Sequence, residues 1–417
     1  MKDKTIFVYA HWVGMAEPQL VGSLFAQRGR TDEIFSFSYD ASWLSSKANI
    51  YQLDPQLQLF AGRQNPNPLT SNFGLFLDSS PDRWGKTLMQ RRQAILARSN
   101  ATKYRPLSES DYLLGVHDIA RMGALRFKLD QGGPFIAEDS PFATPPWARL
   151  RELEYGVSQL EDNPDPAEEA RWITQLVAPG SSLGGARPKA TVANEQGNLW
   201  IAKFPSRNDT NDSGAWEMVV HELASNAGIE VPTAMLQAFS IHGSTFIVQR
   251  FDRTKGNERI HFTSAMALLG KQDGDYDSSY LELAEFITTA SAQPEKDLHQ
   301  LWRRIVFNIA VSNTDDHLRN HGFLLTKKGW KLSPAYDLNP SPNSYDLSLA
   351  IDEVDHSLDF SLALKQAPYF HLSNKEATAI LEEVSDSVCQ WKQTAKKYGL
   401  SSSECMQMES AFTLDTR

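Results

Sequence analysis

Two acids and one amide near residue 320 constrain this chain more than any other part of its sequence. Asp315 is followed five positions later by Asn320, and Asp337 arrives after a stretch, GFLLTKKGWKLSPAY, that is typical of a hairpin. Such a hairpin would return the Asp337 carboxylate to the side of the Asn320 amide. Carboxylate and amide oxygens are ligands that a hard cation such as Mg²⁺ prefers. Asp315 would then be placed to orient a hydroxyl group.

The neighbouring acid, Asp316, is an alternative to Asp315 as the base. The D-x-x-x-x-N spacing to Asn320 favours Asp315. An isolated pattern of this kind more often ends one helix and caps the next turn, so the pattern needs support from the rest of the chain.

That support begins with Lys203, which closes the strand-like run WIAKF. The run is the second half of a hairpin predicted over 189–204, where two β-rich stretches flank a Glu-Gln-Gly-Asn turn. A helix with a Ser at its start is predicted next, over 213–228. Glu217 on this helix is the expected partner of Lys203, and Glu222 is the alternative.

A glycine-rich loop precedes the hairpin and reads GSSLGGARPK from Gly180. Its glycines, Gly184 and Gly185 among them, relax the φ/ψ limits, so backbone amides can wrap a phosphate. The loop also matches Gly-x-Ser-x-Gly, with Ser182 as nucleophile and Asp337 and His356 following in serine-hydrolase order. A hydrolase needs a strand before this serine and a helix after it, whereas the sequence predicts the reverse.

A strand lysine, a helix glutamate and an Asp-Asn-Asp set occur here in the chain order of protein kinases. In that chemistry Lys203 anchors the phosphates of ATP, and Asn320 and Asp337 hold magnesium. Asp315 orients the substrate hydroxyl, and Arg319 neutralises charge on the transferred group. We therefore expect an α+β, two-lobed protein-kinase-like fold. Its parts would be a mostly β N-terminal subdomain, a mixed α/β small lobe and an all-α C-terminal lobe.

The length of 417 residues exceeds what one compact core usually holds. We expect an N-terminal subdomain over 1–145, a small lobe over 146–255 and a helical lobe over 256–417. Within the first part, 51–62 has the composition of a strand. Residues 79–99 begin with Ser-Pro-Asp, which is a helix start signal.

Composition limits the cellular compartment and the binding partners that can be expected for this chain. A net charge of −10 argues against a chain that coats nucleic acid by itself, so any DNA contact is expected through a partner. Two cysteines cannot build a disulfide framework, and neither a signal-peptide core nor a long apolar run is visible. These features predict a cytoplasmic protein that does not enter a membrane.

Six segments taken together resemble the HipA family of toxin serine/threonine kinases. They are SSLGGARPKA, WIAKF, WEMVVHELASNAGIEVP, VQRFDR, NTDDHLRNHGFLL and LSPAYDLNPS. The resemblance implies that ATP and Mg²⁺ bind between two lobes. By position it assigns catalysis to Asp315 and adenine contact to Gln249 and Phe251. It makes Ser182 the loop serine that is autophosphorylated. Gln249 departs from the family pattern, in which Glu is usual.

The resemblance also implies partners. Members of the family act with a helix-turn-helix antitoxin that binds DNA, and they phosphorylate a protein of the translation machinery, an aminoacyl-tRNA synthetase. A homodimer is a further expected assembly. The main alternative is a non-catalytic corepressor that keeps the fold and works by binding a DNA-binding antitoxin.

Overall fold

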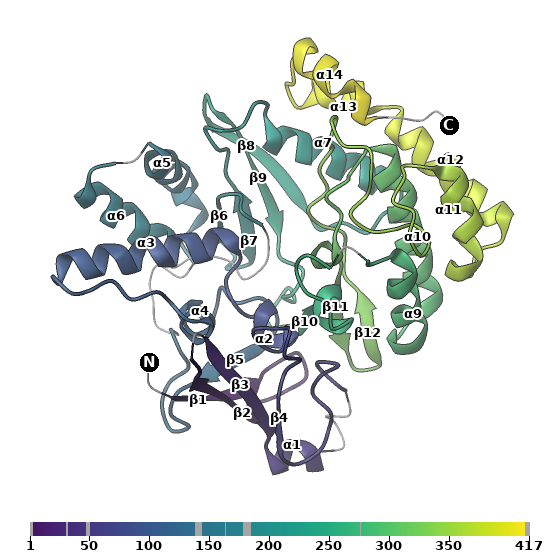
Figure 1. Cartoon of the computed structure of the whole chain (residues 1–417). Coiled ribbons are helices and arrows are strands. Elements are labelled where there is room, and N and C mark those ends of the chain that lie inside the picture. The colour runs from purple at the N-terminus through teal and green to yellow at the C-terminus, as the bar shows by residue number, and fades with distance from the viewer. Residues whose placement is uncertain are drawn as a thin grey trace. The chain divides into compact units, whose positions relative to one another are not determined.

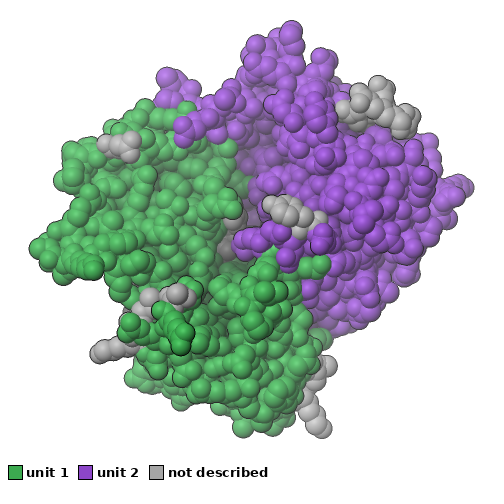
Figure 2. Space-filling view, in the orientation of Figure 1, with its two compact units in different colours: residues 1–207, 252–263, 270–272 green, residues 208–251, 264–269, 273–417 purple. Residues whose placement is uncertain are grey.

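The computed structural model describes residues 3–30, 32–46, 51–137, 144–162, 164–177, 185–275 and 277–412 and is a mixed α+β structure (Figure 1). These residues form two compact units, which Figure 2 colours green and purple. Unit 1 is Met1–Arg207 with Asp252–Thr263 and Gly270–Gln272. Unit 2 is Asn208–Phe251 with Ser264–Leu269 and Asp273–Arg417. The domain boundaries expected from sequence motifs are a different kind of division and stay a prediction.

An antiparallel sheet forms the N-terminal part of unit 1, with its five strands in the order β4-β3-β2-β1-β5. Alternate side chains of β1, namely Ile6, Val8 and Ala10, are buried, as the period-two geometry of a strand requires. The strands are β1 (Lys4–Ala10), β2 (Gln19–Arg28), β3 (Glu33–Tyr39), β4 (Arg63–Gln64) and β5 (Leu125–Lys128).

The strand expected over 51–62 is absent from this described stretch, which consists of turns. The buried Asp54 carboxylate explains the difference, because it accepts hydrogen bonds from the backbone N–H groups of Gln56 (2.9 Å) and Leu75 (2.8 Å). A side chain that takes backbone donors in this way competes with strand pairing. The apolar pattern alone did not reveal this competition.

Helices follow the sheet in unit 1. The predicted helix after Ser-Pro-Asp is α3, where Asp82 caps the first turn by accepting a hydrogen bond from Gly85 N at 2.7 Å. Helix α3 packs on α6, and α6 packs on α5. The helices are α1 (Ala41–Ser45), α2 (Gly74–Asp78), α3 (Arg83–Ser99), α4 (Glu109–Gly115), α5 (Leu150–Glu161) and α6 (Pro166–Val177), with a 3-10 turn at Trp147–Arg149.

Two hairpins carry the central β structure, and the first of them is the hairpin predicted over 189–204. In unit 1, β6 (Lys189–Ala193) pairs antiparallel with β7 (Leu199–Lys203). In unit 2, β8 (Ala234–Ser240) pairs antiparallel with β9 (Gly243–Gln249), and α7 (Ser213–Asn226) packs on β9. The residue that caps α7 is Asp212 rather than the expected serine, because its carboxylate accepts from Ala215 N at 3.0 Å.

The rest of unit 2 is mainly helical and surrounds the largely buried α10, which lies against α9, α11 and α12 (Figure 1). Among the described residues, no helix combines the length and apolar character that crossing a membrane requires. The remaining elements are β10 (Phe262–Ser264), α8 (Ala265–Leu268), α9 (Tyr280–Ala290), α10 (Pro294–Ala310), β11 (Gly322–Thr326), β12 (Gly329–Leu332), α11 (Phe360–Gln366), α12 (Asn374–Val388), α13 (Trp391–Lys397) and α14 (Ser402–Met408), with 3-10 turns at Leu318–Asn320, Ala367–Phe370 and Glu409–Ala411.

The close approach of α7 to β9 depends on Gly214. A Cβ atom at this position would lie 2.0 Å from the backbone oxygen of Ser244. We expect Gly214→Ala to lower the free energy of unfolding by about 1–3 kcal/mol, although alanine favours helices more than glycine does. Urea denaturation measures the change. The control is Gly256→Ala, where the nearest atom is 3.7 Å away. Equal midpoints for the two variants would contradict this account of the packing.

Candidate functional site

The loop that follows α10 contains two adjacent acids with opposite surroundings. Asp316 is buried, and its Oδ2 atom accepts hydrogen bonds from Tyr280 Oη (2.6 Å) and Asn308 Nδ2 (2.8 Å). The same oxygen lies 2.8 Å from Nε2 of His321. Asp315, by contrast, is exposed. These surroundings fit a structural role for Asp316, and Asp315 is the solvent-exposed carboxylate of the two.

The electrostatics of Asp316 agree with a structural role. Burial alone would raise the pKa of its carboxyl, but the charge and hydrogen bond of His321 and the hydrogen bond from Tyr280 together lower it. Burial and the negative charge of Asp316 both disfavour a tyrosinate, so they raise the pKa of the Tyr280 hydroxyl well above its ordinary value. Asp316 is therefore a fixed anionic acceptor around which the loop is arranged.

Hydrogen bonds bring the neighbourhoods of Asn320 and Asp337 together. The Asn320 amide donates from Nδ2 to the backbone oxygen of Asp315 at 2.9 Å, which leaves Oδ1 as the atom that a cation would take. Tyr336 donates its hydroxyl to the backbone oxygen of Arg319 at 2.6 Å. Tyr336 precedes Asp337 and Arg319 precedes Asn320, so this bond joins the two segments that carry the candidate metal ligands.

Further bonds tie the segment after Asp337 to the loop after α10. Asn339 N donates to Asn313 Oδ1 at 3.2 Å, and Ser341 N donates to the backbone oxygen of Ser312 at 3.1 Å. Asp337 itself has a φ of +60°, a left-handed conformation that costs free energy in any residue other than glycine. Strained backbone of this kind persists only where the surroundings enforce it, and it is concentrated at functional sites.

The donor set of this loop pair fits magnesium. Mg²⁺ is usually held by one or two protein carboxylates, and phosphate oxygens and water complete its octahedral shell. The carboxylate of Asp337 and the amide oxygen of Asn320 match that pattern. Across the described ranges, no cluster of three or more His, Cys, Asp or Glu side chains offers a metal site of its own.

One further predicted residue, Phe251, adjoins this region. The Phe251 ring lies 5.4 Å from the Tyr336 ring, centroid to centroid, so it touches the segment that carries Asp337. Gln249, at the end of β9, donates its backbone N–H to Thr233 O at 2.8 Å. Tyr336 was missed by sequence reasoning. Its position directly before Asp337 was the only signal for it.

Arg319 is half-exposed and lies 3.0 Å from the carboxylate of Asp273 through its Nε atom. The same nitrogen is 3.3 Å from the sulfur of Met266. Ion pairs this exposed contribute only about 0–1 kcal/mol. The pairing therefore does not prevent Arg319 from turning toward a phosphate.

Lys203 and Glu217 lie in different units. Lys203 ends β7 in unit 1, Glu217 lies in the first turns of α7 in unit 2, and both are buried. The alternative acid, Glu222, is bound elsewhere, because it pairs with Lys397 at 2.6 Å and accepts a hydrogen bond from the Tyr398 hydroxyl. Glu217 thus remains the better candidate partner of Lys203.

The described end of the glycine-rich loop is bound to the first turn of α3. Lys189 Nζ lies 3.2 Å from Asp82 Oδ2 and donates to the backbone oxygen of Gly185 at 3.0 Å. Trp84 N donates to the same Gly185 oxygen at 3.4 Å. Lys189 and Asp82 are both buried, and burial raises the pKa of the Asp82 carboxyl while Lys189 opposes the rise. Ser182 and Gly184 lie outside the described residues.

Lys189 is also the residue directly opposite Lys203 in the β6–β7 register. Opposite residues of an antiparallel pair share a face, so two lysine side chains leave the hairpin on the same side. Sequence reasoning missed Asp82, which neutralises one of them. The Ser-Pro-Asp helix start was visible, but nothing in the sequence linked it to a lysine more than a hundred residues later.

The serine-hydrolase alternative lacks its local structure. The loop runs from α6, which ends at Val177, to β6, which begins at Lys189. A nucleophile elbow requires a strand before the serine and a helix after it. His356, the expected third member, is bound through Nδ1 to Leu347 O at 2.9 Å.

Comparison with known proteins places the chain in a family. Residues 181–392 match the family described as "HipA-like C-terminal domain", so the chain belongs to that family. The chain is 28% identical over 227 residues to a Haemophilus influenzae protein named "Putative kinase", which covers 47% of this chain and 65% of that protein. It is 30% identical over 158 residues to "Putative kinase Y4mE" of Sinorhizobium fredii, which covers 36% of each chain. The chain therefore spans less than two thirds of these relatives.

The fold agrees with this membership. The HipA chain of the Shewanella oneidensis MR-1 toxin–antitoxin complex of HipA, HipB and operator DNA matches with a TM-score of 0.66 and 16% identity. The match covers 98% of this chain and 95% of that chain. This likeness confirms the expected α+β, kinase-like fold class.

The two adjacent acids should respond differently to removal. We expect Asp316→Ala to lower the free energy of unfolding by about 3 kcal/mol, because it leaves a buried hydroxyl, amide and imidazole without their shared acceptor. Asp315→Ala should change it by no more than about 0.5 kcal/mol. Urea denaturation followed by circular dichroism makes the comparison. If Asp315→Ala were destabilised and Asp316→Ala were as stable as wild type, Asp315 rather than Asp316 would be the structural acid.

The Asp82–Lys189 pair predicts a double-mutant result. Lys189→Met should cost about 3–5 kcal/mol, because it leaves a buried carboxylate without its cation. Adding Asp82→Asn, which can still cap α3, should recover at least about 1 kcal/mol of this loss. The matched control is Lys86→Met in α3, whose half-buried pair with Glu109 is far more accessible to solvent and should contribute less than about 1 kcal/mol. Additive losses in the double variant would show that the pair is not coupled.

Proposed function

We propose that the chain is an ATP- and Mg²⁺-dependent serine/threonine protein kinase of the HipA toxin type. The observation that supports the proposal is the exposed Asp315, whose backbone oxygen accepts from the Asn320 amide, together with the Tyr336–Arg319 hydrogen bond that joins this loop to the segment carrying Asp337. An accessible carboxylate next to two oxygen ligands is the arrangement that phosphoryl transfer requires.

In this proposal Asp315 orients the substrate hydroxyl and accepts its proton. The hydroxyl oxygen bonds to the γ-phosphorus as the bond from that phosphorus to the bridging oxygen of ADP breaks. Asn320 and Asp337 hold magnesium, which when bound neutralises phosphate charge. Most of the acceleration comes from positioning and electrostatic stabilisation rather than from covalent chemistry.

The remaining predicted residues bind the nucleotide. Lys203 contacts the phosphates with Glu217 as its partner, Arg319 neutralises charge on the transferred group, and Gln249 and Phe251 contact adenine. The residues Ser182, Gly184 and Gly185 of the glycine-rich loop cover the phosphates, and Ser182 is the autophosphorylation site.

The proposed partners follow from the family. The solved Shewanella HipA is in complex with HipB and operator DNA, which supports a helix-turn-helix antitoxin for this chain and DNA contact through that partner. A protein of the translation machinery, an aminoacyl-tRNA synthetase, is the proposed substrate, and the cytoplasm is the proposed location. A homodimer is the proposed assembly.

Incubation with γ-labelled ATP and Mg²⁺ tests the activity. Wild-type protein should incorporate label, and Asp315→Ala and Asp337→Ala should each lose at least about 100-fold of the rate, because base and metal ligand are removed. Chelation of Mg²⁺ should abolish labelling. The matched control is Asp346→Ala, an exposed acid of the same region, which should label normally. Equal labelling of all variants would refute the proposal.

Variants of the loop separate the alternatives. Ser182→Ala should lose self-labelling while still labelling an added protein substrate. Tight binding of a helix-turn-helix antitoxin without any ATP turnover would instead select a non-catalytic corepressor. A fluorophosphonate probe that reacts with wild type but not with Ser182→Ala would select a serine hydrolase.

A further inference from the structure

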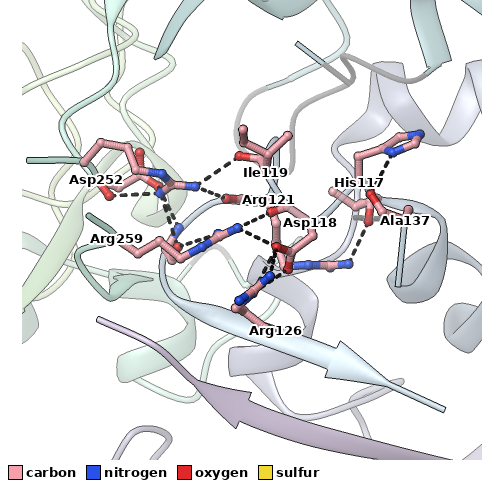
Figure 3. A network of polar contacts seen from close by, with 11 residues as sticks. His117, Asp118, Ile119, Arg121, Arg126, Ala137, Asp252 and Arg259 are labelled. Atoms are coloured by element: carbon pink, nitrogen blue, oxygen red, sulfur yellow. Dashed lines mark hydrogen bonds and ion pairs between the residues drawn. The ribbon is translucent and has the colours of Figure 1, made fainter. Parts of the chain in front are cut away.

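The segment that follows Phe251 is bound to the N-terminal part of unit 1 by a network of buried charges (Figure 3). We call this network the linker anchor and define it as Asp118, Gly123, Arg126, Asp252, Arg253 and Arg259. Asp252, Arg253 and Arg259 belong to the segment that follows Phe251. Asp118, Gly123 and Arg126 come from the stretch around the start of β5.

Asp252 is fully buried, and its Oδ2 atom accepts a hydrogen bond from Gly123 N at 2.8 Å. The Arg253 guanidinium lies 2.5 Å from the same oxygen and donates to the backbone oxygens of Ile119 (3.1 Å) and Arg121 (3.0 Å). An anion and a cation next to each other in the chain are thus both satisfied by the same short stretch of the N-terminal subdomain.

Arg259 forms the second attachment. Its Nη2 atom donates to Asp118 Oδ2 at 2.9 Å and to the backbone oxygen of Asp118 at 2.6 Å. Arg126 approaches the same carboxylate at 2.8 Å. Burial would raise the pKa of Asp118, but the charge of Arg259 and the hydrogen bond and charge of Arg126 together lower it. Asp118 is therefore an anion shared by two arginines, as Figure 3 shows.

Backbone contacts hold the segment equally closely. Gly123 has a φ of +73°, and a Cβ there would lie 3.0 Å from Phe262 N and 3.2 Å from Phe262 O. Val13 N donates to Arg259 O at 2.8 Å, and the rings of Trp12 and His261 stack 5.4 Å apart. Residues 252–262 are thereby fixed by side chains and by backbone.

The chain enters this anchor directly from the segment proposed to contact adenine, Gln249 to Phe251. We propose that Asp118 is a positioning residue for nucleotide binding, which it supports by holding Arg259 and thereby fixing the segment continuous with Phe251. This inference rests on the proposed kinase function. The apparent Kd of a ligand equals its intrinsic Kd divided by the fraction of time that the site spends in the competent arrangement. A loosened anchor should therefore weaken nucleotide binding more than it slows the chemical step.

The test compares Asp118→Asn with Asp54→Asn. Both remove a buried carboxylate from the N-terminal subdomain, but Asp54 accepts from the backbone N–H groups of Gln56 and Leu75, which lie outside the linker anchor. Calorimetry with Mg²⁺ and a non-hydrolysable ATP analogue gives Kd, and labelled ATP gives KM and kcat. We expect Asp118→Asn to raise Kd and KM about tenfold, equivalent to about 1.4 kcal/mol, with kcat changed less than twofold. Asp54→Asn should leave Kd unchanged even where it lowers Tm.

Arg259→Lys and Arg259→Met provide a graded check and replace Asp118→Asn if that variant does not fold. Lysine keeps the positive charge but lacks the planar set of guanidinium N–H donors. The nucleotide Kd of Arg259→Lys should therefore fall between those of wild type and Arg259→Met. Hydrogen exchange of residues 249–262 should rise in the same order. Equal Kd values for wild type, Asp118→Asn and Arg259→Met would overturn the positioning role. Absence of nucleotide binding by wild type would refute the proposed function itself.

Discussion

The geometry of the candidate site depends on one buried carboxylate, that of Asp316. Asp316 gathers hydrogen bonds from Tyr280 on α9 and Asn308 on α10 and faces His321, which leads into β11. Three elements therefore meet at a single oxygen atom. Because an unpaired buried acceptor or donor costs about 1–3 kcal/mol, the loop has little freedom to adopt another path. Its constraint exposes Asp315 and points the Asn320 amide at the Asp315 backbone.

Buried carboxylates also organise their surroundings in unit 1, where they pair with lysine and arginine side chains. Asp82 neutralises Lys189, and Asp118 is shared by Arg126 and Arg259. Buried ion pairs of this kind are poor sources of stability, since desolvation offsets most of the attraction, but they penalise every arrangement that separates the partners. They therefore specify where the described end of the glycine-rich loop and residues 252–262 lie.

Local patterns predicted several of the elements. The β6–β7 hairpin, α3, α7 and the β11–β12 hairpin follow from turn residues, helix start signals and periodicity that lie within or next to each element. The strand expected over 51–62 failed because Asp54 diverts backbone donors, an effect that depends on a partner at Leu75. The choice between Asp315 and Asp316 stayed open for the same reason. Burial is decided by residues such as Tyr280, which are distant in the sequence.

The register pair Lys189–Lys203 shows how such a distant partner bears on chemistry. Two ammonium groups on one face of a hairpin repel each other, at an effective dielectric constant near 20, by about 2–4 kcal/mol at separations of 4–8 Å. Asp82 removes that repulsion by pairing with Lys189. The neutralising group comes from the first turn of α3, more than a hundred residues earlier in the chain, so only the fold brings it to the hairpin.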